Sequence, residues 1–266
     1  MFARIGEVFK GFFKGWNSFE LIFLQACIVF PVVLGILFGS GALEIVSAVM
    51  LLISTLLLAK GKVKGFMLYI ISLALYCVVS FQQQLYGELI YSALLSIPLA
   101  SYGLWKAWSN KRNDSDKGEV IIVQRIKMRE IGLLLLVVIA VSIGMYFLLD
   151  FFNTAFLIVS TISLASNLLG EYLVARRTQF GMSGFILSDI IGLILWALLL
   201  ADGHMGAIPL IVAYCFLFVN DIYGTIEWQR LRKEQVVEMA MSKVSKETVW
   251  ELETDKSGVK GINREE

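Results

Sequence analysis

The basic residues of this chain occupy only every second connection between its long apolar segments. Eight segments are long and apolar enough to cross a membrane, at residues 21–38, 43–59, 65–81, 89–105, 131–149, 155–175, 182–201 and 207–228. When the chain is threaded through these segments, all 23 Lys and Arg residues fall on one side. Because cytoplasmic loops retain Lys and Arg, we expect a multi-pass protein of the cell (plasma or inner) membrane with its N- and C-termini in the cytoplasm.

The composition agrees with residence in a lipid bilayer. Hydrophobic residues make up 58% of the chain and the mean hydropathy is +0.74, whereas a soluble domain is roughly 45–50% apolar with Gly included. The apolar runs are continuous and do not alternate with polar residues, which favours helices over a barrel. The sequence therefore predicts an all-α membrane protein with about eight transmembrane helices.

Other sequence features argue against several classes of function. A net charge of +1, distributed by topology, gives little support to a nucleic-acid partner. Cys27, Cys77 and Cys215 lie inside expected spans and lack the spacing of a metal site or a disulfide framework. The sequence contains no Walker loop, metal-ligand cluster or nucleophile–base pair. We therefore expect no cofactor, no bound metal and no enzymatic activity.

Three further segments differ in character from the spans. In residues 1–20, apolar side chains recur at helical spacing among Arg4, Lys10 and Lys14, a pattern typical of a helix in the membrane interface. Residues 106–130 form a basic cytoplasmic loop. Residues 229–266 form a charged cytoplasmic tail, for which we expect a short helix and then disorder. A membrane sensor or scaffold that recruits a partner through this tail is an alternative to a carrier.

An internal repeat relates the two halves of the chain. The corresponding pairs are Gly65 with Gly184, Phe66 with Phe185, Gly87 with Gly206, Tyr102 with Tyr223 and Gly103 with Gly224. The repeats are then three-helix units at residues 43–105 and 155–228, joined by a linker helix at 131–149 and preceded by an extra helix at 21–38. One intervening helix returns the chain to its starting side, so the copies are parallel, as in SWEET-type transporters, whose substrate binds near the midplane.

Polar side chains in the second repeat suggest where a ligand binds. Asp189 and Asp221 each lie seven residues from the cytoplasmic end of an expected span, which places both about 10 Å deep. An Asp in a span costs roughly 2.5–3.5 kcal/mol on insertion scales. Asn167 and Glu171 follow each other at helical spacing in the sixth span. The candidate substrate-binding residues are Asn167, Glu171, Asp189, Trp196, Tyr214, Asn220 and Asp221; the alternative is that they hydrogen-bond between helices and only stabilise packing.

Several motifs resemble the PnuC family of vitamin and nucleoside transporters over residues 43–228. They comprise Tyr86, Gly87 and Glu88; Pro98, Tyr102, Gly103 and Trp105; Glu171, Arg176 and Arg177; and Asn220, Asp221, Ile222, Tyr223, Gly224 and Trp228. The resemblance implies a homotrimer in the lipid bilayer. It also implies that each protomer carries a nicotinamide riboside-like vitamin or nucleoside by facilitated diffusion, and that phosphorylation in the cytoplasm traps the product.

One departure from the family pattern bears on the substrate. Family members that take nicotinamide riboside carry two tryptophans spaced by three after the second basic loop. In this chain the matching positions are Gly181 and Gly184, or Met182 and Phe185. The departure favours, more than the family name would suggest, the alternatives of a thiamine, riboflavin or deoxynucleoside carrier with the same fold.

Overall fold

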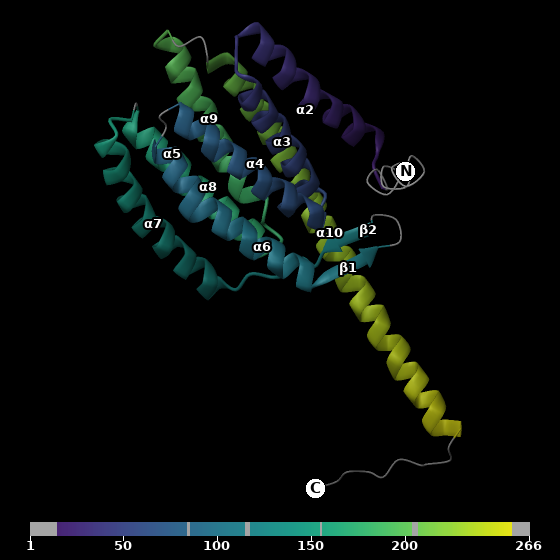
Figure 1. The fold of residues 1–266 in the computed structure, drawn as a ribbon. Helices are drawn as coiled ribbons and strands as arrows, with labels where there is room; N and C mark the ends of the chain where they lie inside the picture. Colours follow the sequence, from purple (N-terminus) through teal and green to yellow (C-terminus); the bar gives the residue numbers. More distant parts are fainter. Residues whose placement is uncertain (1–14, 84–85, 115–117, 155, 204–206, 257–266) are drawn as a thin grey trace.

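The computed structural model describes residues 15–83, 86–114, 118–154, 156–203 and 207–256. The expected interfacial helix lies largely outside the described residues, since the description starts at Gly15. The elements are α2 (Ser18–Leu37), α3 (Ala42–Ala59), α4 (Val63–Gln82), α5 (Tyr86–Tyr91), a π-helical turn η1 (Ser92–Ser96), α6 (Ile97–Ser109), β1 (Lys111–Asp114), β2 (Gly118–Ile121), α7 (Met128–Phe151), α8 (Leu157–Ala175), α9 (Ser183–Ala201) and α10 (Ala207–Lys256). Figure 1 shows their arrangement.

The helical membrane fold is confirmed. Within the described residues, seven single helices are long and apolar enough to cross a membrane: α2, α3, α4, α7, α8, α9 and the first part of α10. The eighth expected span is the continuous run α5–η1–α6. A π-helical turn interrupts this run just before Pro98. Proline has no amide hydrogen and so removes one helical hydrogen bond, and a local π turn accommodates this loss. The outward faces of the helices are apolar. On α7 only Leu134, Met145 and Leu149 are buried, and the exposed side chains include Leu136 and Phe147.

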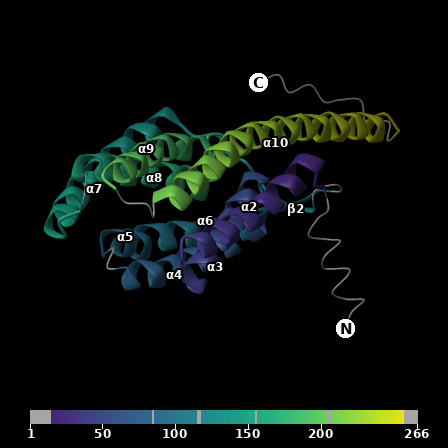
Figure 2. The same ribbon diagram turned by 90° about the horizontal axis from the view of Figure 1, so that it is seen from above.

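The helices form two groups that pack against each other. Figure 2 shows α2 to α6 on one side and α7 to α10 on the other. Within the groups α3 packs on α4 and α8 packs on α9; between the groups α10 packs on α3 and α6 packs on α8. Glycines allow these close approaches. A methyl group at Gly224 would come within 3.0 Å of the Ala59 Cα, and one at Gly103 within 3.1 Å of the Ala175 Cα.

The central connection is more ordered than the loop that we expected. β1 and β2 form an antiparallel hairpin in which Lys111 faces Ile121. We call residues 118–126 the strap, because they cross the ends of both helix groups. The Ile121 amide donates to the Gly61 carbonyl at 2.8 Å, and the Gln124 amide donates to the Arg177 carbonyl, also at 2.8 Å. Charged residues dominate the sequence of this connection, but its apolar side chains Val120, Ile121 and Val123 are buried in the core.

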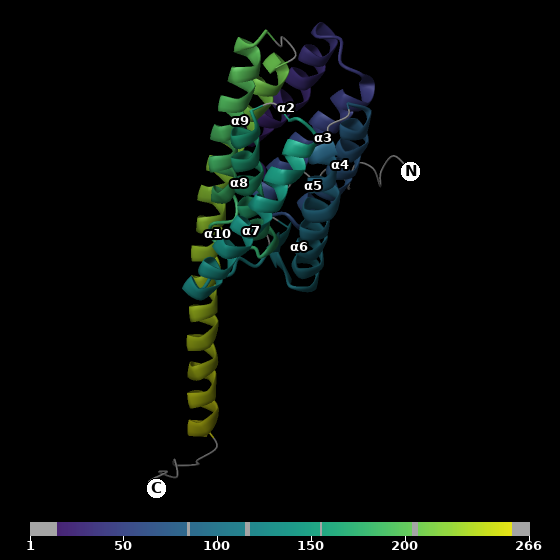
Figure 3. The ribbon, with the colours of Figure 1, turned by 90° about the vertical axis from the view of Figure 1, so that its left-hand side faces the viewer.

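The tail is a single long helix rather than a short one. α10 has 50 residues, which corresponds to a length of about 75 Å. Its second half projects away from the bundle (Figure 3). Near the bundle, Gln235 accepts from the Val123 amide at 3.0 Å and donates to the Ile121 carbonyl at 2.9 Å. These two bonds anchor the first turns of the projecting part to the strap.

Candidate substrate-binding site

Two carboxyl groups meet between α9 and α10. Asp189 and Asp221 are 4% and 3% exposed, and their carboxyl groups lie next to each other. The neighbouring Asn220 donates from Nδ2 to Asp221 Oδ1 at 3.0 Å. Asn220 Oδ1 and Asp189 Oδ2 are buried and have no hydrogen-bond partner within the described part of the chain. Buried polar atoms are normally paired, so these two are free to receive hydrogen bonds from a ligand.

Two aromatic side chains continue this layer. Gly192 lies one turn beyond Asp189 on α9, and the ring of Tyr214 packs directly on it. Trp196 lies one further turn along the same face and contacts Tyr214. The indole Nε1 is buried and without a partner among the described residues. The structure therefore brings Asp189, Trp196 and Tyr214 together.

Glu171 forms a second acidic position between α8 and the first helix group. It is 6% exposed and accepts from the Tyr91 hydroxyl at 3.2 Å. Tyr69 of α4 also lies against its carboxyl group. A small cavity, with room for about one water molecule, adjoins the carboxylate and is lined by Phe66, Tyr69, Ala100, Glu171, Val174, Ala175 and Phe185.

Glu88 is a functional candidate that our candidate set left out. In the structure, Tyr76 donates to its carboxylate at 3.4 Å, and Tyr214 lies close enough to interact with it. Tyr69 and Tyr76 are seven residues apart on one face of α4, and this spacing is the sequence signal that could have indicated an aromatic stripe.

Asn167 is less closely joined to these groups. Its side chain is only half-buried, although it lies one turn from Glu171 on α8. Among the described residues it makes no hydrogen bond. Its position on the face of Glu171 agrees with the expected polar stripe, but the structure does not bring it into contact with the aspartate pair.

The carboxyl groups of Glu88, Glu171, Asp189 and Asp221 thus lie between the helices alongside tyrosine and tryptophan rings. No Lys or Arg forms an ion pair with any of the four within the described ranges. Such a site can accept hydrogen bonds from hydroxyl groups and can stabilise a positive charge, since carboxylates are acceptors when ionised and aromatic faces attract cations.

A bundle of membrane-spanning helices with polar side chains between its two halves is typical of membrane transporters. The chain belongs to the nicotinamide mononucleotide transporter family, whose model matches residues 41–230. It is 25% identical over 226 residues to the nicotinamide riboside transporter PnuC of Neisseria mucosa, across 83% of this chain and 84% of that protein. Its fold is similar to the crystal structure of a vitamin B3 transporter PnuC, with a TM-score of 0.73 and 22% identity over 85% of this chain and 96% of that one.

These comparisons confirm the resemblance to the PnuC family that the motifs indicated. The chain is a PnuC-type membrane transporter and not an enzyme.

Proposed function

We propose that this transporter carries a positively charged, hydroxylated vitamin of the nicotinamide riboside type. The observation that carries the proposal is the group of buried carboxyl groups without a basic partner among the described residues, with Asp189 and Asp221 at its centre. Nicotinamide riboside has a permanent positive charge on its pyridinium ring and three hydroxyl groups on its ribose. A buried carboxylate is costly unless it is compensated, and a cationic ligand supplies that compensation.

The aromatic side chains support the same substrate class. Tyr214 and Trp196 present flat surfaces next to Asp189, and a pyridinium ring can stack there with its charge over an aromatic face. Thiamine, which also has a permanent positive charge, remains an alternative. Riboflavin and deoxynucleosides are neutral and would leave the carboxyl groups uncompensated. The name of the relative from Neisseria mucosa supports nicotinamide riboside over thiamine.

Binding to the purified protein tests this proposal. Nicotinamide riboside should bind more tightly than riboflavin or thymidine, as measured by isothermal titration calorimetry. Asp189→Asn removes one negative charge and keeps the shape. Because hydrogen bonds to charged groups contribute about 1.5–3 kcal/mol, the affinity should fall by roughly tenfold to a hundredfold. Ile194→Ala, at an outward position on the same helix that is 50% exposed, is the control. Tight binding of a neutral ligand that Asp189→Asn leaves unchanged would refute the proposal.

We further infer the physiological setting from the family resemblance. In this proposal the chain is a homotrimer in the plasma or inner membrane, with both termini in the cytoplasm. Each protomer equilibrates its substrate by facilitated diffusion, and cytoplasmic phosphorylation traps the product. The three-helix repeats at residues 43–105 and 155–228 act as parallel units around the site. Light scattering of the purified protein, corrected for detergent, would distinguish a trimer from a monomer.

A further inference from the structure

Two ion pairs occupy corresponding places in the two helix groups. Glu20 is the third residue of α2 and pairs with Lys60, the residue that caps the C-terminus of α3. Glu130 is the third residue of α7 and pairs with Arg176, which caps α8, with Nε to Oε1 at 2.6 Å. The acid lies near a helix N-terminus and the base at a helix C-terminus, so both pairs are favoured by the helix dipoles.

The residues after the two bases also correspond. Gly61 follows Lys60 and Arg177 follows Arg176, and both adopt left-handed backbone conformations, with φ of +66° and 54°. Their carbonyl groups are the two acceptors that the strap uses. α7 is therefore paired with α8 in the same way as α2 is paired with α3. The strap holds the ends of α3 and α8 together.

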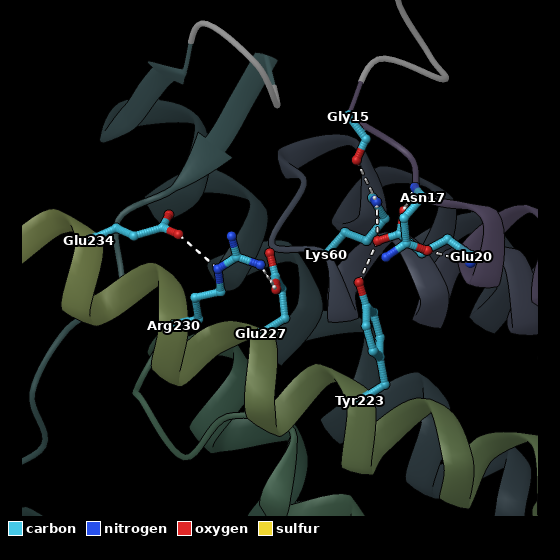
Figure 4. Close-up of polar contacts among 8 residues, drawn as sticks. All are labelled: Gly15, Asn17, Glu20, Lys60, Tyr223, Glu227, Arg230 and Glu234. Atoms are coloured by element: carbon cyan, nitrogen blue, oxygen red, sulfur yellow. Dashed lines mark hydrogen bonds and ion pairs between the residues drawn. The ribbon is translucent and has the colours of Figure 1, made fainter.

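The first ion pair includes a third partner from the other helix group. The Tyr223 hydroxyl of α10 donates to the Glu20 carboxylate, and Figure 4 shows Tyr223 directed at the Glu20–Lys60 pair. Lys60 Nζ also donates to the Gly15 carbonyl at 3.1 Å and lies 4.7 Å from the Trp16 ring centroid. Glu20 and Lys60 are buried. This network joins α2, α3 and α10, and so it spans the contact between α3 and α10, which we call the α3–α10 seam.

Among the residues that the structure describes, the equivalent contact between α6 and α8, the α6–α8 seam, has no such network at this end. Tyr102 is the repeat counterpart of Tyr223, but it is 37% exposed and makes no hydrogen bond among the described residues. The second ion pair instead receives a hydroxyl from Tyr172 of α8 itself, which donates to Glu130 Oε1 at 2.9 Å. Its members stay within α7 and α8 and do not hold α6.

Two further features lie along the α6–α8 seam. The cavity next to Glu171 is lined by Ala100 of α6 and by Val174 and Ala175 of α8. Beyond it lies Arg177, whose guanidinium is 1% exposed and has Nε and Nη1 without partners in the described structure. Burial lowers the pKa of Arg177, because the buried charge is poorly compensated. Opening of this seam would hydrate Arg177 and would leave the Glu130–Arg176 ion pair and the hydroxyl that Tyr172 donates to it intact.

We propose that the α3–α10 seam stays closed during transport and that substrate is released to the cytoplasm through the α6–α8 seam. The proposal rests on the cytoplasmic placement of the termini given above. In this arrangement, opening of the α3–α10 seam would break the hydrogen bond that Tyr223 donates to the buried Glu20 carboxylate, and a buried acceptor that loses its hydrogen bond is unfavourable. The strap keeps α3 and α8 at a constant separation, so α6 is the helix that moves.

Paired cysteines across the two seams test the proposal. The matched pairs are Ala59→Cys with Gly224→Cys, and Ala175→Cys with Gly103→Cys. All are made in a protein in which Cys27, Cys77 and Cys215 are replaced by alanine. A Cβ at Gly224 lies 2.9 Å from the Ala59 Cβ, and one at Gly103 lies 3.1 Å from the Ala175 Cα, so each pair is close enough for a disulfide. The new Cβ atoms also come within 2.8 Å of Met182 and 2.5 Å of Phe66, so these side chains must move, and the reduced form of each pair is its reference. Uptake of labelled nicotinamide riboside into proteoliposomes is measured before and after reduction, so each pair is its own control.

The disulfide between positions 103 and 175 should abolish uptake, with full recovery on reduction. The disulfide between positions 59 and 224 should change uptake by less than about twofold. The reverse result, or inhibition by both disulfides, would overturn the proposal.

A second measurement needs neither substrate nor a disulfide. Tyr223→Phe removes the hydroxyl that spans the α3–α10 seam, whereas Tyr102→Phe is the equivalent change at the other seam. Hydrogen exchange in residues 56–62 should accelerate at least about tenfold in Tyr223→Phe, and exchange in residues 172–178 should be unchanged in Tyr102→Phe. Equal effects of the two variants would contradict the proposal. If the unmodified protein takes up no nicotinamide riboside, the proposed substrate is wrong, and the exchange comparison still tests whether Tyr223 holds the α3–α10 seam closed.

Discussion

The ring of Tyr214 on α10 lies directly over Gly192 on α9, so that a methyl group added at Gly192 would come within 2.1 Å of Tyr214 Cε1. Gly192 lies between Asp189 and Trp196 on one helix face. This contact places a tyrosine ring next to the aspartate pair, and it is possible only because position 192 has no side chain.

Gly192→Ala should therefore displace the Tyr214 ring and weaken ligand binding. Losing a cation–π contact costs about 0.5–2 kcal/mol, so the affinity should fall by roughly twofold to thirtyfold. Gly144→Ala on α7, where an added methyl group meets nothing within 4 Å, is the control. Equal affinities of the two variants, measured by calorimetry, would show that Tyr214 is not part of the site.

Glu171 and Tyr91 should act together. Glu171→Gln and Tyr91→Phe each remove one side of a buried hydrogen bond, and each should weaken binding or reduce stability. Because the two residues share one contact, the effects of the double variant should be smaller than the sum of the single effects. A double-mutant cycle on ligand affinity measures this difference. Strict additivity would mean that the contact contributes nothing to the site.

Gln235 should stabilise the strap. Its buried side chain satisfies the Val123 amide and the Ile121 carbonyl, and Gln235→Ala leaves both backbone groups without this partner. Each buried unsatisfied group costs about 1–3 kcal/mol, so the thermal unfolding midpoint in detergent should fall by several degrees. Val237→Ala, at an exposed position two residues on, should leave the midpoint nearly unchanged. Equal unfolding midpoints of the two variants would show that the bonds between Gln235 and the strap do not contribute to stability.

The proposed topology can be tested with single cysteines. Residues Ser40, Asn153 and Gly203 follow α2, α7 and α9, and cysteines at these positions should react with an impermeant thiol reagent added outside intact cells. A cysteine at Ser242, in the projecting part of α10, should react only after the cells are opened. Labelling of position 242 in intact cells would show that the C-terminus lies outside the cell, opposite to the proposed orientation.

Sequence patterns predicted most of the fold because membrane insertion depends on local properties. The long apolar segments located eight spans, and each corresponds to a helix or to the run α5–η1–α6. The length of α10 was missed, since its charged second half resembles a disordered tail in composition. The order of the strap was missed as well, because its hydrogen bonds join residues far apart in the sequence, such as Gln235 and Val123.

The candidate site was predicted in part. Asp189 and Asp221 were recognised because a charge inside a span needs a partner or a function, and the structure places them side by side. The contacts of Glu171 with Tyr91 and of Glu88 with Tyr76 depend on how helices pack, which helical spacing within one segment does not determine.

Uptake by purified protein in proteoliposomes tests the central claim most directly. We expect labelled nicotinamide riboside to enter vesicles that lack any H⁺ or Na⁺ gradient, to stop at the outside concentration, and to enter faster when unlabelled nicotinamide riboside is present inside. Thymidine and riboflavin should not compete. Failure of uptake, or accumulation above the outside concentration that an ionophore abolishes, would contradict facilitated diffusion of a cationic vitamin by this protein.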